Sequence, residues 1–361
     1  MKKTVAIVGA GVNGVCAAVA LGELGHHVTL IDKGEPFAET SSKSSKLLHG
    51  GIRYLEHFHF GLVREALSER AWWLKEAPRH TTQRRFYMPI YQGMPRSRWL
   101  LYVGAKLYQV LAGRKSLGSS AYHSKRETLE ANPHLSDVGL LGSVSYMDVQ
   151  MDEPGLSAWL LDRAVSAGVE LMSHTPVASV STEGQVVLAT EESLSFDWVV
   201  NAAGPWASAL LQASSIASDY RIELVRGSHL RFARKLSHPL VIQSRFDQRI
   251  IFLLPEPGGM LCGTTEVPHE DGAEVVCTAD ESRYLLRAVE GVLREPLVES
   301  EITERFSGVR PIAYERAGHG HFSSASRDSQ IEVMGQLISV FGGKWTSAMH
   351  LGQEIATKVR C

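Results

Sequence analysis

Residues 4–33 read TVAIVGAGVNGVCAAVALGELGHHVTLIDK, and this stretch decides the fold that we expect. The uncharged apolar run 4–8 is typical of a strand buried on both faces of a parallel sheet. An apolar helical pattern follows as far as Leu24, and Gly25 is expected to end that helix. A second strand is predicted over residues 27–31, so the stretch forms a strand, a helix and a strand in succession.

Three glycines between the first strand and the helix, Gly9, Gly11 and Gly14, form the pattern G-x-G-x-x-G. The first permits a tight turn, the second lets the backbone approach a pyrophosphate, and the third lets the helix pack closely on the strand. The helix N-terminus can then bind the phosphate charge. Asp32 follows the second strand, where it can accept hydrogen bonds from a ribose diol. The ordered set predicts a dinucleotide site and leaves open whether FAD or NAD binds.

The composition is that of an ordinary globular protein: 361 residues, 44% hydrophobic and 21% charged, long enough for one large domain or two. The formal net charge of -2 gives no indication of a nucleic-acid partner. Four cysteines lie without C-x-x-C spacing, which favours reduced thiols and no metal site. No signal peptide precedes the first strand, and no apolar run reaches the roughly 18 residues of a spanning helix. We therefore expect a cytoplasmic protein.

The polar and glycine-rich phrase SSKSSKLLHGGIRYLE, residues 41–56, is the second informative stretch. It resembles the flavin-facing loop of the FAD-dependent glycerol-3-phosphate dehydrogenases, in the D-amino-acid-oxidase-like group of flavoproteins. The resemblance covers nearly the whole chain. It includes WVVNAAGPW at 198–206, RGSHL at 226–230, GTTE at 263–266 and FGGKWT at 341–346.

The resemblance implies an α/β fold, with a Rossmann-like FAD-binding domain of the GR2/DAO type and an inserted antiparallel-sheet substrate domain. The FAD-binding domain would be discontinuous, over residues 1–85, 148–214 and 325–361. The substrate or cap domain would take residues 86–147 and 215–324. Typical members of the family continue into a further helical C-terminal domain, so this sequence is expected to be a short form.

Residue patterns predict further elements. Helices are expected at 62–77, 153–168 and 345–359, from apolar residues at helical spacing. A strand at 143–152 should return to the nucleotide domain. A small meander is predicted within 177–200, a strand at 336–341, and a series of short strands between 215 and 324.

The cofactor residues come from the glycine motif and from the resemblance, which implies non-covalent FAD. The residues expected to line FAD are Gly9, Gly11, Asn13, Gly14, Asp32, Lys33, Ser45, Lys46, His49, Gly51, Val177, Ala203, Gly204, Trp206, Gly343, Lys344, Trp345 and Thr346. A second helix N-terminus, after Gly343, is expected to point at the flavin.

The activity implied by the resemblance is oxidation of sn-glycerol 3-phosphate to dihydroxyacetone phosphate. Hydride would pass to flavin N5, and electrons would leave to quinone or another acceptor. His229 would accept the hydroxyl proton, with Arg310 polarising the oxygen. Substrate contacts are expected from Arg53, Tyr54, Thr264, Arg310, Arg327 and Lys344. The surrounding cations should lower the pKa of His229 and leave it neutral. Glu266 stands where the family usually has Asp.

Residues 96–115 have two interpretations. Basic residues bracket an apolar segment with Trp99, Tyr102 and Tyr108, a composition expected of a helix lying in a membrane interface. The family consists of peripheral membrane enzymes, so the protein would touch the inner face of the membrane. Alternatively, the helix packs on the substrate domain. Lys106 in the middle fits both.

Two other functions remain open at this stage. A relative in the same flavin superfamily could oxidise an amine, an amino acid or a 2-hydroxy acid, with Arg310 binding a carboxylate. A flavin-binding protein without turnover is the second alternative.

Overall fold

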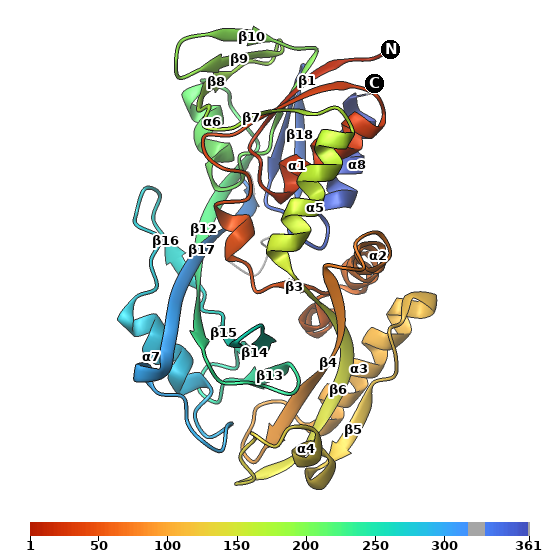
Figure 1. Cartoon of the computed structure of the whole chain (residues 1–361), viewed down its shortest axis with the longest axis vertical. Helices are drawn as coiled ribbons and strands as arrows, with labels where there is room; N and C mark the ends of the chain where they lie inside the picture. Colours follow the sequence, from red (N-terminus) through yellow and green to blue (C-terminus); the bar gives the residue numbers. More distant parts are fainter. Residues whose placement is uncertain (317–328, 360–361) are drawn as a thin grey trace.

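The computed structural model describes residues 1–316 and 329–359, which form two large sheets arranged along the long axis of the molecule (Figure 1). The helices, with short 3-10 helices marked η, are α1 (Val12–Glu23), η1 (Thr40–Lys43), η2 (Ile52–His57), α2 (Phe60–Glu76), α3 (Arg98–Ala112), η3 (Gly113–Lys115), α4 (Lys125–Ala131), α5 (Glu153–Ser166), η4 (Gly204–Trp206), α6 (Ala207–Ala213), α7 (Ala279–Ala288), η5 (Glu299–Glu301) and α8 (Ala348–Val359). The strands are β1 (Thr4–Val8), β2 (His27–Ile31), β3 (Leu47–Leu48), β4 (Thr81–Tyr91), β5 (Ala121–Ser124), β6 (Leu140–Met151), β7 (Glu170–Met172), β8 (Val177–Val180), β9 (Gln185–Leu188), β10 (Ser193–Ser195), β11 (Trp198–Asn201), β12 (Tyr220–Phe232), β13 (Leu240–Gln243), β14 (Ile250–Glu256), β15 (Gly259–Gly263), β16 (Val267–His269), β17 (Ile302–Glu315), β18 (Gln330–Met334) and β19 (Leu337–Phe341).

The first sheet has six strands in the order β18-β19-β11-β1-β2-β7. β1 pairs in parallel with β2 and β11, and β11 pairs in parallel with β19, while β18 is antiparallel. The bounds of β1 and β2 are those expected from the sequence. Four of the five residues of β1 are buried, as a strand covered on both faces must be.

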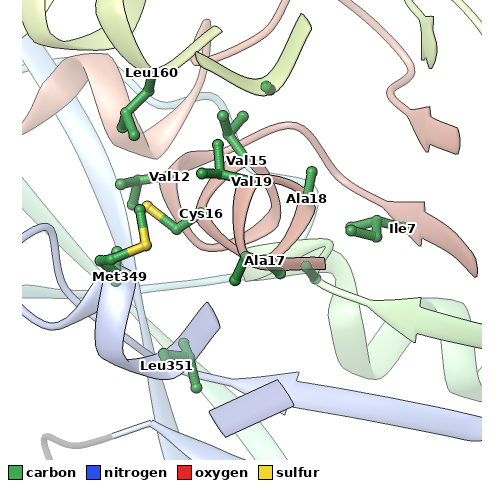
Figure 2. Close-up of a cluster of buried hydrophobic side chains, with 14 of the residues drawn as sticks. Ile7, Val12, Val15, Cys16, Ala17, Ala18, Val19, Leu160, Met349 and Leu351 are labelled. Carbon is green, nitrogen blue, oxygen red and sulfur yellow. The ribbon is translucent and has the colours of Figure 1, made fainter. Parts of the chain in front are cut away.

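Helix α1 packs between α5 and α8. Figure 2 shows its apolar side chains with Leu160 of α5 on one side and Met349 and Leu351 of α8 on the other. The backbones of α1 and α8 come very close, because a Cβ added to Gly352 would lie 2.6 Å from the carbonyl oxygen of Cys16. This packing holds the α1 N-terminus, and with it the glycine motif, at the end of β1.

The second sheet has ten strands, in the order β16-β12-β15-β14-β13-β4-β6-β3, with β17 on β12 and β5 on β6. Helix α3 packs on β6 and α2. The strands expected between 215 and 324 are present, but not all are short. β12 has 13 residues and β17 has 14, paired from Tyr220 opposite Glu315 to Phe232 opposite Ile302. The α/β fold, with one mostly parallel and one mostly antiparallel sheet, confirms the expected fold class.

Three other expectations are corrected or refined. β6 does not return to the nucleotide sheet; it pairs with β3, β4 and β5 in the second sheet, and α5 is the element that returns. The residue pattern of 143–152 predicts a strand but does not identify the sheet to which the strand belongs. The predicted meander is confirmed as β8, β9 and β10. The last helix begins at Ala348, after a turn, and not at 345. The domain borders stay a prediction.

In residues 1–316 and 329–359, no helix combines the length and the apolarity needed to cross a membrane.

Gly352→Ala should destabilise the protein, because the added Cβ meets backbone atoms of α1 that cannot move aside. We expect a loss of about 1–3 kcal/mol in the free energy of unfolding, the usual effect of overpacking. Gly104→Ala in α3 is the matched control, since nothing lies within 4 Å of its added Cβ. That change should stabilise the helix by about 0.5–1 kcal/mol. Urea midpoints at saturating cofactor compare the two, and equal shifts would contradict the packing.

Candidate functional site

A cavity of about 1220 Å³ is lined by residues of both sheets and of the segments between them. Its lining includes the glycine motif after β1, the carboxyl end of β2, the segment 37–56 and the segment 342–346. It also includes apolar residues of β4, α3 and β14. The carboxyl ends of parallel strands are the usual location of a ligand site in an open α/β sheet.

The glycine motif forms the wall of the cavity at the N-terminus of α1. Gly9 has φ +106°, a conformation that favours glycine, and a Cβ on Gly14 would clash with the carbonyl oxygen of Gly9. Gly11 lines the cavity, and a Cβ there would meet only Ser41 Oγ, at 3.3 Å. Gly9 and Gly14 thus make the turn and the packing, while the backbone at Gly11 remains accessible from the cavity.

The acid after β2 lies where the sequence predicts it. One carboxylate oxygen of Asp32 accepts the Ala10 N–H at 2.6 Å and the other accepts the Gly34 N–H at 2.9 Å. Each oxygen keeps a lone pair for a further donor, such as a ribose hydroxyl. Beside it, the Lys33 ammonium lies 3.2 Å from the centre of the Trp206 ring, a cation–π contact between two lining residues.

The segment between β2 and β3 crosses from one sheet to the other. Ser41 Oγ accepts the Val12 N–H of the α1 N-terminus at 3.0 Å, and Ser41 O accepts the Trp345 Nε1–H at 2.9 Å. Lys46 is buried, and its ammonium donates to Glu153 at the start of α5 and to Ser42 O. Lys46 is therefore not among the lining residues, although the sequence placed it against FAD. A buried charge needs a buried partner, and Glu153 provides it.

His49 and Gly51 lie on the lining, in a tight local arrangement. Gly51 N–H donates to His49 Nδ1 at 2.9 Å, and Gly51 has φ +69°. His49 N–H donates to Thr346 Oγ1 at 3.2 Å, which ties this loop to the start of the last helix. Burial lowers the pKa of His49, with Asp148 opposing and Lys344 and Arg70 adding to the effect. His49 is thus a neutral imidazole with a fixed orientation.

A network of buried polar side chains is hydrogen-bonded to the backbone of this loop. Tyr108 Oη accepts the Gly50 N–H at 2.7 Å and donates to Asp148 at 2.9 Å. Arg70 donates to the other oxygen of Asp148 at 3.0 Å, and both charged side chains are at most 3% exposed. Burial is the largest influence on the pKa of Tyr108 and raises it well above its usual value, so the phenol stays protonated.

Cationic residues meet the cavity near β17 and after β19. Arg310 donates to Thr264 Oγ1 at 3.0 Å and lies 3.6 Å from the Glu266 carboxylate. Glu266 also pairs with Arg249, at 2.9 Å. The Lys344 ammonium lies 4.9 Å from the centre of the Tyr54 ring. The Glu at 266, where the family usually has Asp, therefore reaches Arg310 and helps to fix its orientation.

His229 lies near the carboxyl end of β12 and is 2% exposed. Nε2 shares a hydrogen bond of 3.0 Å with Ser45 Oγ, and Nδ1 has no partner among the described residues. The pKa of His229 is lowered to about 3, chiefly by burial and then by Arg310, Lys46 and Arg231. The direction is the expected one, but burial contributes more than the cations.

The structure brings most of the predicted site residues to one cavity. Those that line it are Gly9, Gly11, Asn13, Asp32, Lys33, Ser45, His49, Gly51, Arg53, Tyr54, Val177, Ala203, Gly204, Trp206, Thr264, Arg310, Gly343, Lys344, Trp345 and Thr346. Gly14, Lys46 and His229 do not line it. Arg327 lies outside the described residues. In the described part of the chain, no three His, Cys, Asp or Glu side chains group as a metal site would require.

Four residues that support the site were not found from the sequence: Arg70, Tyr108, Asp148 and Glu153. Asp148 carries a detectable signal, since it is a charge inside the predicted strand SVSYMDVQMD, away from both of its ends. Such a residue is buried with a partner far more often than without one. The partner's identity depends on the fold, so the sequence could not supply it.

The chain is similar to known proteins over most of its length. The family model described as FAD dependent oxidoreductase matches residues 4–357. A D-erythritol 1-phosphate dehydrogenase of Brucella abortus is 34% identical over 96% of this chain and 71% of that protein. A glycerol-3-phosphate dehydrogenase of Pseudomonas tolaasii is 33% identical over 97% of this chain and 70% of that protein.

The solved structures include a glycerol-3-phosphate dehydrogenase of Bacillus halodurans complexed with FAD, with a TM-score of 0.76 and 22% identity. It is covered over 64% of its length, and this chain over 99%. A glycine oxidase of Geobacillus kaustophilus has a TM-score of 0.75 and 22% identity, with 99% of this chain and 95% of that one covered. These two structures show the fold alone.

The residues present fit FAD. The cavity joins the α1 N-terminus, where an anionic pyrophosphate is stabilised, to the loop around His49 and Lys344. Asn13 lines it with a buried Oδ1 that has no partner among the described residues, while its Nδ2 donates to Gly342 O at 3.0 Å. This hydrogen bond joins the glycine motif after β1 to the segment 342–346. It leaves the Asn13 Oδ1 able to accept a hydrogen bond from a ligand.

Glu153→Leu should destabilise the protein strongly, because it leaves the Lys46 ammonium buried without its partner. We expect a loss of about 3–5 kcal/mol in the free energy of unfolding. The double variant Lys46→Met, Glu153→Leu should recover most of that loss, because no charge is left buried. Denaturant unfolding of the two variants gives the comparison.

The exposed pair Arg126–Glu130, at 3.7 Å, is the control. Glu130→Gln should change the unfolding midpoint little, since exposed ion pairs contribute little. A double variant as unstable as Glu153→Leu would show that the pair is not the reason for the loss.

Proposed function

The chain belongs to the FAD-dependent oxidoreductase family, and from that membership we propose that it oxidises a secondary alcohol of a small polyol phosphate to a ketone. sn-Glycerol 3-phosphate is the substrate we put first, with dihydroxyacetone phosphate as the product. Relatives named for oxidation of D-erythritol 1-phosphate and of glycerol 3-phosphate, both more than 30% identical, support this class of substrate.

The observation that carries the proposal is the set of cations on one cavity. Arg53, Arg310 and Lys344 all line it. A phosphate dianion needs several donors at once, and arginine offers a planar fork that engages two oxygens. Thr264 and Glu266 hold the Arg310 guanidinium in place, so its donors are oriented before a substrate arrives. Arg327 is proposed as a further contact.

FAD, when bound, supplies the acceptor for the carbinol hydride. The protein supplies position, charge and a proton acceptor. Arg310 would polarise the substrate oxygen, and His229 would receive the hydroxyl proton. With a pKa lowered to about 3, His229 is neutral at any pH above 5 before a ligand binds. Its basicity would rise when an anionic substrate enters the cavity, because a nearby negative charge favours the protonated ring.

The cofactor residues have separate roles in this proposal. The α1 N-terminus would hold the pyrophosphate, and Asp32 would accept the ribose hydroxyls. Lys33 and Trp206 would cover the adenosine part. The loop at His49 and Gly51 and the segment from Gly343 to Thr346 would hold the isoalloxazine. FAD would bind without a covalent link.

Oxidation of an amine, an amino acid or a 2-hydroxy acid is the alternative, since glycine oxidases share the fold. Arg310 would then bind the carboxylate. A carboxylate needs one such fork, whereas this cavity is lined by several cations, with Arg53, Arg310 and Lys344 among them. A flavin-binding protein without turnover would have no use for these cations beside a buried histidine.

We also propose that electrons leave to quinone, at a membrane surface touched by residues 96–115. Trp99 is 64%, Val103 60% and Leu100 55% exposed on α3, and Val103 and Leu100 also line the cavity. An apolar surface thus continues from the outside of α3 into the cavity, beside the basic residues Arg96 and Arg98. An apolar acceptor in a membrane could reach the flavin by this route.

Addition of sn-glycerol 3-phosphate to the FAD-loaded protein without oxygen should bleach the flavin absorbance promptly. D-Erythritol 1-phosphate should be the next best reductant, and glycerol without its phosphate should reduce the flavin at least about 10²-fold more slowly, because the phosphate contacts are lost. Stopped-flow absorbance measures all three. Reduction by glycine or a 2-hydroxy acid, with none by the polyol phosphates, would overturn the proposal.

Arg310→Lys tests the contribution of Arg310 to phosphate binding. It keeps the charge but loses the fork that engages two oxygens. We expect flavin reduction to slow by about 10-fold or more at low substrate concentration, while the flavin content stays normal.

Trp99→Ser with Val103→Ser should reduce binding to vesicles of phosphatidylcholine and phosphatidylglycerol, measured by co-sedimentation. The two side chains provide the exposed apolar area that would enter the interface. Val165→Ser, which removes a 62% exposed valine from α5, is the control and should bind as the unchanged protein does. Equal binding by all three proteins would place any membrane contact elsewhere.

A further inference from the structure

The site contains two histidines in different hydrogen-bonding situations. His49 Nδ1 accepts the Gly51 N–H at 2.9 Å, so a neutral His49 carries its proton on Nε2. Nε2 has no partner among the described residues, and His49 lines the cavity. His49 therefore offers a donor to the cavity and not a base. Moving its proton to Nδ1 would break the bond with Gly51.

His229 differs from His49, because its hydrogen bond is made by Nε2 with a side-chain hydroxyl. His229 does not line the cavity. Its ring stacks on Phe306, with centroids 4.9 Å apart and planes at 13°. On β15, Gly263 lies so close that an added Cβ would clash with the imidazole. His229 is 2% exposed and does not line the cavity, so the ring is covered in this structure.

Ser45 is the connection between His229 and the cavity. Its Oγ shares a hydrogen bond of 3.0 Å with His229 Nε2, and Ser45 itself lines the cavity. His229 makes no other side-chain hydrogen bond among the described residues, and its Nδ1 is buried without a partner. Among the side chains of the described residues, the Ser45 hydroxyl is therefore the hydrogen-bonding link between His229 and the cavity.

We infer that Ser45 is the group that takes the hydroxyl proton from the substrate, and that His229 receives a proton through Ser45. This inference rests on the proposed function. The substrate O–H bond breaks and a new O–H bond forms at Ser45 Oγ. In the same step the original Ser45 O–H bond breaks and an N–H bond forms at His229 Nε2. The carbinol hydrogen leaves with the electron pair of its C–H bond as hydride, for which FAD, when bound, is the acceptor, so the substrate loses two electrons and two hydrogens.

The charges around His229 fit a transient acceptor. Arg310, Lys46 and Arg231 act on the ring, and together with burial they keep it neutral before substrate binds. Substrate brings a phosphate dianion to the same cavity, which favours a positive charge nearby. The imidazolium therefore forms only with substrate present. Ser45 is the catalytic residue of this pair, and His229 acts through it.

The test is anaerobic flavin reduction by saturating sn-glycerol 3-phosphate in four FAD-loaded proteins: the unchanged protein, Ser45→Ala, Ser45→Thr and Ser42→Ala. Ser45→Ala should slow reduction by about 10²-fold or more, the contribution of a general base. Ser45→Thr, which keeps a hydroxyl, should restore most of the rate. Ser42 donates to the carbonyls of Ala38 and Glu39 in the same loop and does not line the cavity, so Ser42→Ala should react as the unchanged protein does.

Two further measurements separate a proton relay from a structural effect. Binding of dihydroxyacetone phosphate, followed by perturbation of the flavin absorbance, should have the same dissociation constant in Ser45→Ala. In mixtures of H2O and D2O, the reduction rate of the unchanged protein should fall along a curve, because two protons move in one step. Ser45→Ala should lose that curvature.

The outcomes that overturn the inference are distinct from failure of the proposed function. If no polyol phosphate reduces the unchanged protein, the proposed function fails and the relay fails with it. If the unchanged protein is reduced and Ser45→Ala is reduced equally fast, the relay alone is wrong. Ser45→Thr as slow as Ser45→Ala would also exclude a hydroxyl relay.

Discussion

The buried ion pair between Lys46 and Glu153 determines how the site is assembled. It joins the segment that leaves the nucleotide sheet to the first turn of α5, at the point where the chain passes between the two sheets. Lys46 also has φ +57°, and its carbonyl accepts the Met151 N–H at 2.9 Å. Because the side chain and the backbone of Lys46 are both held, the neighbouring residues Ser45 and Leu47 have fixed orientations. Ser45 meets His229, and Leu47 enters β3 opposite Gln150.

The same segment explains why two distant stretches of sequence form one cavity. Ser41 contacts both the α1 N-terminus and Trp345, while His49 contacts Thr346. The phrase 41–56 thus lies between the phosphate end and the flavin end of the proposed cofactor site. Desolvation of the Lys46 charge costs several kcal/mol unless it is paired. The position of Glu153 therefore sets the orientation of the Lys46 side chain, and the backbone of Lys46 in turn sets the orientation of Ser45.

Sequence reasoning succeeded where the signal is local. β1 and β2 have the expected bounds because their apolar runs and the glycines between them set the structure within about 30 residues. It failed where a direction depends on a distant partner. Lys46 was expected to face FAD, but Glu153, 107 residues away, takes its charge. Charge and position in a loop do not reveal whether a side chain faces the cavity or a buried partner, so Ser45 and Lys46 could not be told apart.

The two histidines show why residue type alone does not assign a role. Both are neutral, and burial is the first cause in each case. His49 accepts from a backbone N–H that cannot turn away, since Gly51 holds a left-handed conformation, so its remaining nitrogen is a donor. His229 meets a serine hydroxyl, which can donate or accept as needed. A backbone partner fixes a tautomer, whereas a hydroxyl partner leaves the proton free to move. The hydrogen-bond partner of each ring therefore decides its role: the backbone N–H makes His49 a fixed donor, and the serine hydroxyl lets His229 accept a proton.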